Sequence, residues 1–271
     1  MAGIQTSYPT TRALGYAGGL ADSGPHDTKS VIAAVAIAAG LVVVKGATPA
    51  KGYLPATPDT ADVDAIVATG GASAASAQTL SGAALDGVVG VTAMFPPRPI
   101  TLVLSSHADW NLTVAKIVGT DFRGDVIAED VVIPDAGNVT VTTALAFRTV
   151  TSIYIPAQGG TGGTFTAGFG APLGPINGAV VHGVALYDAT REPEAYPVGY
   201  VVPCARKGRI FVTSETSYSD GDPVFVRFIA TGDEVAGQVR NVADSNDCAR
   251  LEGARFWRTG SAGVAAINLD L

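Results

Sequence analysis

The residues that could carry out catalysis are few and far apart in this sequence. Its histidines are His26, His107 and His182, and none of them lies in the HExxH spacing or another metal-ligand spacing. His182 alternates between Val181 and Gly183 in a predicted strand, where a structural histidine is the favoured interpretation. The histidines therefore indicate neither a metal centre nor a general base.

The glycine-rich and acidic motifs are typical of turns. The sequence has no GxSxG nucleophile elbow, Walker A loop or GxGxxG fingerprint, and Gly159–Gly163 lacks the helix and lysine of a phosphate-binding loop. The acids of Asp59–Asp64 and Asp220–Asp222 do not have EF-hand spacing, so turn formation is the default interpretation and adventitious calcium binding is the alternative. The sequence thus predicts no enzyme and no metal or cofactor site.

The charge balance argues against a nucleic-acid partner. The chain of 271 residues has a formal net charge of −7 and a pI near 4.9, so a phosphate-binding face would need a basic cluster set against the overall field. The densest candidate, Arg206–Arg209, falls between two predicted strands and is interpreted as a solvated hairpin turn. We therefore expect no nucleic-acid binding.

The apolar run Val31–Val44 raises the question of a membrane segment. It is shorter than the ~20 residues that span a bilayer. The segment before it contains Pro9 and Pro25 and does not have the pattern of a signal peptide. A buried strand pair turning at Gly40 accounts for the run, and no membrane partner is expected.

The two cysteines, Cys204 and Cys248, are far apart in the sequence. They permit one intrachain bridge but have no CxxC spacing. We predict two lone thiols in a protein that is assembled in a reducing cytosol.

Short predicted strands joined by turn residues indicate an all-β protein. Between Val180 and Phe228, β-like runs alternate with glycine, proline and aspartate turns, as in a sandwich or a barrel. Earlier strands are predicted at Val63–Ala68 and Gly87–Met94. The composition agrees, because the chain has 33 glycines and 16 prolines and only 15% charged residues.

Two proline-rich segments, Phe95–Pro99 and Ala171–Pro175, indicate domain boundaries. Six predicted strands lie between them: Ile100–Leu104, Asn111–Val118, Val126–Ile133, Asn138–Thr142, Arg148–Ile155 and Thr164–Phe169. Their regular spacing predicts an inserted immunoglobulin-like β-sandwich over residues 96–172, with Trp110 as an aromatic of its core or rim. The host domain, a sandwich or barrel, is then expected to consist of residues 28–94 plus 176–271.

Residues 1–27 are predicted to form an extended N-terminal arm. Glycines recur between Gly15 and Gly24, and they weaken regular structure. Tyr8 and Tyr16 are the large side chains of this segment. Such an arm orders chiefly against a partner surface, and simple terminal disorder is the alternative.

A series of glycine-based motifs follows in order along the chain: Gly15–Gly24, Ala36–Val42, Gly183–Ala185, Lys207–Val212, Asp220–Val224, Ala254–Phe256 and Ala262–Ile267. This series resembles the structural cement (capsid decoration) proteins of tailed bacteriophages, and it covers about two thirds of the chain. Two features depart from the family pattern. Ala38 and Ala39 stand where Pro-Phe is expected, and the family core is normally uninterrupted.

The resemblance implies a non-enzymatic virion structural protein. Such a protein binds the outer surface of the assembled head, bridges subunits of the major capsid protein and commonly forms a homotrimer about a local threefold axis. The arm is then expected to dock on capsid protein or on a neighbouring copy through Tyr8, Tyr16 and Leu20. Assembly in the host cytoplasm and a final location on the virion surface follow from the same resemblance.

Two other functions remain open at this point. The first is a phage surface adhesin whose immunoglobulin-like domain binds a host glycan or receptor, and an exposed aromatic cluster around Trp110 and Phe122 would favour it. The second is a tail or baseplate component, which the same β architecture could serve.

Overall fold

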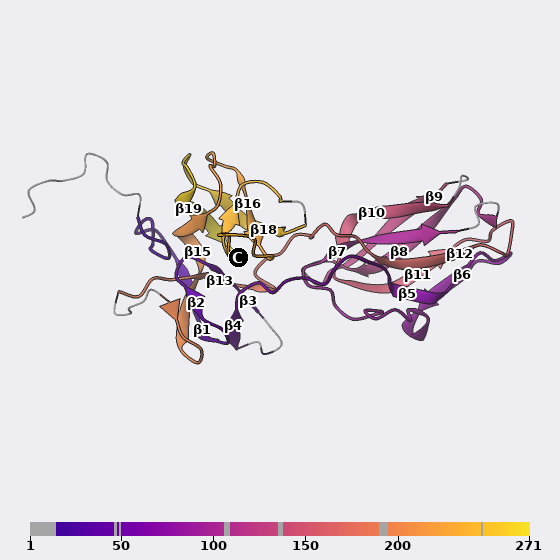
Figure 1. The fold of residues 1–271 in the computed structure, drawn as a ribbon, viewed down its shortest axis with the longest axis horizontal. Helices are drawn as coiled ribbons and strands as arrows, with labels where there is room; N and C mark the ends of the chain where they lie inside the picture. Colours follow the sequence, from indigo (N-terminus) through magenta and orange to yellow (C-terminus); the bar gives the residue numbers. More distant parts are fainter. Residues whose placement is uncertain are drawn as a thin grey trace, which may run out of the picture.

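The computed structural model describes residues 15–45, 48, 50–105, 109–134, 138–189, 195–244 and 246–271. Its secondary structure is all-β apart from one short 3-10 helix, η1 (Gly82–Ala84), as the turn-rich sequence predicted. The strands gather in two lobes along the long axis of the molecule (Figure 1), and we call them the ring lobe and the sandwich lobe. No helix in the described ranges is long and apolar enough to cross a membrane.

The ring lobe contains eleven strands: β1 (Asp27–Ala33), β2 (Ile37–Ala38), β3 (Val42–Lys45), β4 (Lys51–Tyr53), β13 (Val181–Ala185), β14 (Ala195–Tyr196), β15 (Val201–Ser214), β16 (Pro223–Arg227), β17 (Val239–Arg240), β18 (Cys248–Phe256) and β19 (Gly263–Asp270). The sandwich lobe contains eight: β5 (Asp62–Ala72), β6 (Gln78–Ser81), β7 (Arg98–Leu104), β8 (Thr113–Thr120), β9 (Val126–Ile133), β10 (Val139–Phe147), β11 (Thr149–Ile155) and β12 (Thr164–Phe169).

In the ring lobe, strand pairing closes two five-stranded rings that share β15. The first ring runs β1-β4-β3-β13-β15 and closes through the β1–β15 pairing, and the second runs β15-β17-β16-β18-β19 and closes through β15–β19. The two halves of β15 serve different rings, because Val201–Ala205 pair with β1 and Lys207–Ser214 pair with β19. Closure removes the open sheet edges that would otherwise pair with other chains.

Alternating side chains place β3 between two cores. Val43 packs with Val31, Val202 and Cys204 inside the first ring, and Val42 and Val44 pack into the second core. Successive residues of a strand point to opposite faces, so a strand buried on both faces is apolar at every position. This burial explains the unbroken run of valines.

The strand pair predicted for Val31–Val44 is only partly correct. Gly40 does turn the chain, with φ +80°. The flanking strands do not pair with each other, because β2 pairs with β14, and β3 pairs with β4 and β13. The predicted hairpin turn at Arg206–Arg209 is wrong, since these residues lie inside the continuous strand β15.

The sandwich lobe consists of two four-stranded sheets, ordered β10-β7-β12-β5 and β6-β11-β8-β9. Residues of both sheets, such as Leu102, Phe147, Ile117 and Ile153, share one buried core. The lobe is therefore a β-sandwich. Its finer assignment as immunoglobulin-like stays a prediction.

The predicted boundary near residue 96 is wrong, because β5 and β6 already belong to the sandwich lobe. β5 pairs with β12, and β6 pairs with β11. The predicted strand Gly87–Met94 is instead a series of turns that bonds back to β5, where Gly87 N donates to Ile66 O at 3.0 Å. In strand pairing, the first segment of the ring lobe thus ends with β4 rather than at residue 94.

Candidate partner-binding surface

The described part of the N-terminal arm lies along β15 and is joined to it by backbone hydrogen bonds and one isolated antiparallel bridge, Leu20 to Ile210. Gly18 N donates to Phe211 O at 2.7 Å, Phe211 N donates to Gly19 O at 2.8 Å, and Ala21 N donates to Arg209 O at 2.9 Å. On its other side, Gly18 O accepts from Tyr187 N at 2.9 Å. The arm thus occupies the edge of β15 that faces away from β19.

Close approach to the backbone explains two of the arm's glycine contacts. Gly18 has φ +81°, and a Cβ there would lie 2.6 Å from Tyr187 N. A Cβ on Gly40, which also has positive φ, would lie 2.5 Å from the Ala17 Cβ. Only glycine adopts these conformations at little cost. The glycines therefore allow the arm to pack closely against the ring lobe of its own chain.

A chain of charged and aromatic contacts connects the arm to the far end of β18. The Asp22 carboxylate pairs with the Arg209 guanidinium at 2.7 Å. This guanidinium lies 4.1 Å from the centre of the Trp257 ring, and Arg258 lies 4.4 Å from the same ring. Such cation–π contacts hold the exposed arginines in fixed positions beside the arm.

The three predicted arm anchors have different outcomes. Tyr8 lies outside the described residues. The Tyr16 ring packs on Tyr187 with ring centres 4.5 Å apart, yet 56% of the residue is exposed. Leu20 bridges to Ile210 and is 40% exposed. Tyr16 and Leu20 therefore contact their own chain and also leave apolar surface exposed. Their docking on a partner stays a prediction.

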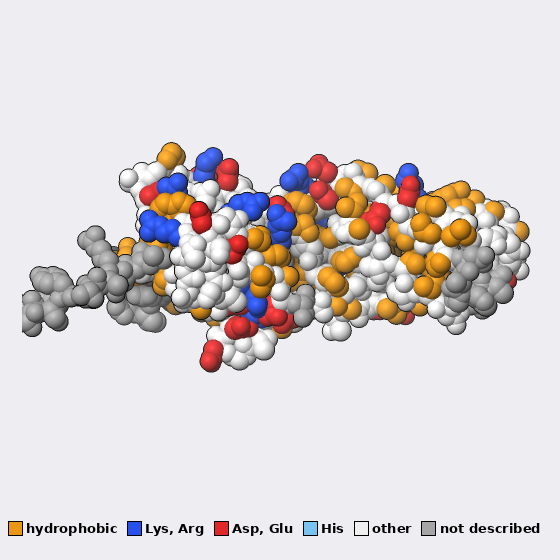
Figure 2. Space-filling view, turned by 90° about the horizontal axis from the view of Figure 1, so that it is seen from above, with side chains coloured by type: hydrophobic (Ala, Val, Ile, Leu, Met, Phe, Trp, Pro, Cys, Tyr) orange, Lys and Arg blue, Asp and Glu red, His pale blue; other side chains and the backbone are white. Residues whose placement is uncertain are grey.

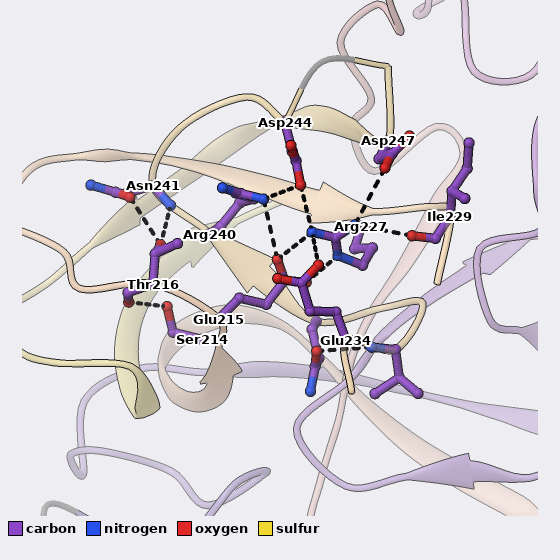
Figure 3. A network of polar contacts seen from close by, with 12 residues as sticks. Ser214, Glu215, Thr216, Arg227, Ile229, Glu234, Arg240, Asn241, Asp244 and Asp247 are labelled. Atoms are coloured by element: carbon purple, nitrogen blue, oxygen red, sulfur yellow. Dashed lines mark hydrogen bonds and ion pairs between the residues drawn. The ribbon is translucent and has the colours of Figure 1, made fainter. Parts of the chain in front are cut away.

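A buried ionic network connects the loops of the second ring (Figure 3). The fully buried Arg227 donates to both carboxylate oxygens of Glu215, at 2.6 and 2.8 Å, and to Asp244 at 2.8 Å. Glu234 pairs with the same guanidinium at 2.5 Å, and Arg240 pairs with Asp244. Bidentate geometry of this kind holds three loops in one arrangement.

The same contacts shift the ionisation of the network toward its charged forms. The hydrogen bonds that Arg227 donates, first of all to Glu215, raise the pKa of Arg227. The hydrogen bond from Arg227 is the main cause that lowers the pKa of Asp244. The guanidinium thus fills the space among the carboxylates, and no group of three or more metal-ligating residues was found in the described part of the chain. No local signal in the sequence predicts this network, because its members come from separate strands and loops.

Other sequence-predicted residues are structural. Trp110 is buried in the sandwich core, as predicted, and its Nε1 donates to Ser105 O at 2.7 Å. Cys204 and Cys248 are both free, as predicted, and the structure places both in buried positions. Burial raises the pKa of the Cys204 thiol to about 12. Asp222 closes its turn by accepting from Ser219 N at 2.8 Å.

Surface chemistry also differs between the lobes. In Figure 2, most of the charged side chains on this face lie on the ring lobe and at the near end of the sandwich lobe. Toward its far end, the sandwich lobe shows mainly apolar and uncharged side chains. Fold and surface together define a β-rich structural protein.

Comparison with known families assigns this structural protein to a class. Residues 133–270, slightly more than half of the chain, match the family described as Structural cement protein (E217 gp24/Pam3 gp6). The chain therefore belongs to the structural cement protein family, as its ordered motifs predicted, and it is a structural protein of the phage capsid. The match begins at the end of β9 and includes strands of both lobes. No curated protein matches the chain.

Proposed function

We propose that this protein binds the outer surface of the phage head and bridges subunits of the major capsid protein. The observation that carries the proposal is the family match over residues 133–270. The function is mechanical. Each interface of roughly 1,600 Å² adds buried area across a seam, and repetition over the shell multiplies the effect through avidity.

The ring lobe is proposed as the part that contacts the capsid. It carries the arm, and the exposed faces of Tyr16 and Leu20 lie beside the arginines on Trp257. Apolar side chains next to fixed arginines are the composition enriched at protein interfaces. The sandwich lobe, at the other end of the molecule, then projects away from the shell.

Cosedimentation with expanded, undecorated heads tests this function. The full-length chain is compared with a version that lacks residues 1–14 and with the double variant Tyr16→Ser/Leu20→Ser, which keeps the backbone pairing of the arm. We expect saturable binding by the full-length chain and weaker binding by both variants. Tyr154→Ser, an exposed aromatic change on the sandwich lobe, is the matched control and should bind normally.

The outcome that would contradict the proposal is equally direct. If the full-length chain does not sediment with heads, the protein does not act as a head cement. Equal loss in the Tyr154→Ser control would instead reject the assignment of the contact to the ring lobe.

A homotrimer about a local threefold axis is the proposed assembly state, because a closed ring matches the symmetry of the shell. Native mass spectrometry of the free and head-released protein tests it. The adhesin alternative would be favoured by an exposed aromatic cluster around Trp110 and Phe122. Trp110 is instead packed in the core and offers no aromatic platform.

A further inference from the structure

One end of the first ring collects positive charge that no local motif predicts. β3 ends at Lys45, next to the start of β4 and β13. β1 runs parallel to β4 and meets it at Ile32, so Lys29 extends beyond the start of β4. β13 pairs with Ala205, which brings Arg206 to the same end of the ring.

The side chains of Lys45 and Arg206 are held by carbonyl groups. Lys45 Nζ donates to the carbonyl oxygens of Gly178 and Ala179, each at 2.8 Å. Arg206 donates to Leu271 O at 3.2 Å, and its guanidinium also borders Gly178. The two cations are thus positioned side by side around one short loop. The peptide carbonyls of Gly178 and Ala179 orient the charge of Lys45 but do not neutralise it.

The positive charges act on one another. Burial lowers the pKa of Lys45, and Lys29, Arg206 and Arg148 lower it further. Arg148 comes from the sandwich lobe, between β10 and β11. Lys29, Lys45 and Arg148 form no ion pair with another residue that the structure describes.

A buried histidine at the same end is also incompletely bonded. His182 Nε2 donates to Lys51 O at 3.1 Å, and its buried Nδ1 has no hydrogen-bond partner among the described residues. Gathering like charges beside such a group costs stability, and proteins tolerate that cost chiefly at functional sites. In a chain of net charge −7, the neutralising charge is expected to come from a partner.

We propose that this basic ring end, formed by Lys29, Lys45, Arg206 and Arg148, binds an acidic segment of a protein. Carboxylates supply the missing charge, and they accept charge-assisted hydrogen bonds from lysine and arginine. A protein segment is favoured over nucleic acid because the patch is compact and neighbouring carboxylates flank it, among them Asp270, which pairs with Lys207 at 3.3 Å. The inference adds the chemistry of one contact to the proposed function and rests on that function for the partner's location.

Fluorescence anisotropy with a labelled hexaglutamate peptide at low salt tests the site on the full-length chain. The site variant is Lys29→Gln/Arg148→Gln, which leaves the carbonyl-bound Lys45 and Arg206 in place. The control variant is Lys116→Gln/Arg255→Gln, which removes the same charge from exposed strand positions elsewhere. We expect peptide affinity to fall about tenfold in the site variant, as for two lost charged contacts, and less than twofold in the control.

Three results would overturn the inference. They are no peptide binding by the natural chain, an equal loss in both double variants, and displacement of the peptide by duplex DNA of higher affinity. The single variant Lys29→Gln, at an exposed position, should lose affinity without any effect on folding. Failure of the proposed function is seen separately, because a chain that binds the peptide but not heads contradicts only the head-binding proposal.

Discussion

The two lobes of this protein are stabilised in different ways. The sandwich lobe relies on alternating strands that bury one shared apolar core. The ring lobe combines two apolar cores with the buried Arg227 network. The sandwich lobe depends mainly on a hydrophobic pattern that tolerates substitution, whereas the ring lobe depends on particular residues.

The largest difference is expected from the buried arginine. Arg227→Ala leaves the Glu215 carboxylate, 2% exposed, without its main partner. Removing one member of a buried pair costs about 3–5 kcal/mol. Hydrogen exchange measured strand by strand should show lost protection in β16–β18 and unchanged protection in the sandwich lobe. Arg255→Ala, at an exposed position, serves as control, and equal protection in both variants would contradict the structural role of Arg227.

A core truncation in the sandwich lobe should reduce hydrogen-exchange protection in that lobe and leave the ring lobe unchanged. Ile117→Ala removes a fully buried side chain and is expected to cost about 2–5 kcal/mol. The same exchange experiment should show the loss in β5–β12, with the ring lobe unaffected. If protection falls equally in both lobes, they unfold as one unit and the comparison between them fails.

Strand positions in the sandwich lobe were the easier part to predict. Val126–Ile133 and Thr164–Phe169 were predicted with the bounds that β9 and β12 have in the structure, because alternation and turn residues are local signals. β15 was interrupted in the prediction at Arg206–Arg209, since a strand that changes partners halfway resembles two strands joined by a turn. Only long-range pairing distinguishes the two cases.

The candidate sites were also hard to predict, because they depend on long-range strand pairing. The arm motif and its tyrosines could be predicted from neighbouring residues, but the position of the arm on β15 could not. The basic ring end is assembled from β1, β3, β15 and the sandwich lobe, so its four cations are far apart in the sequence. Sites built from distant strands become visible only when the register is known.

A smaller difference between the lobes is expected when one glycine of each lobe is replaced by alanine. Gly18→Ala must adopt φ +81° and also meets the Tyr187 backbone, whereas Gly124→Ala in the sandwich lobe has φ +93° and open space around it. Backbone strain of about 1–2 kcal/mol applies to both. Only Gly18→Ala should release the arm, which limited proteolysis between residues 15 and 27 detects. Equal cleavage of the two variants would show that the arm does not depend on this fit.

The smallest expected effect is a pH dependence of the ring lobe. Burial, together with Lys29, Lys45 and Arg206, lowers the pKa of His182 from its ordinary value of 6.5, against the hydrogen bond to Lys51 O that raises it. The unfolded chain therefore binds a proton at a pH where the folded chain does not, and stability falls as the pH drops from about 6.5 toward the lower folded value. Urea unfolding from pH 7.5 to 5 measures it. His182→Asn should flatten this part of the profile, and an unchanged slope would exclude His182 as the cause.

The strand shared by the two rings has a consequence for how the ring lobe responds to load. The backbone of β15 bonds to β1 along one half and to β19 along the other, so displacing the whole of β15 breaks strand pairings in both rings. The arm bonds to Arg209 and Phe211 of β15. A pulling force on the arm is therefore passed to β15 and through it to both rings.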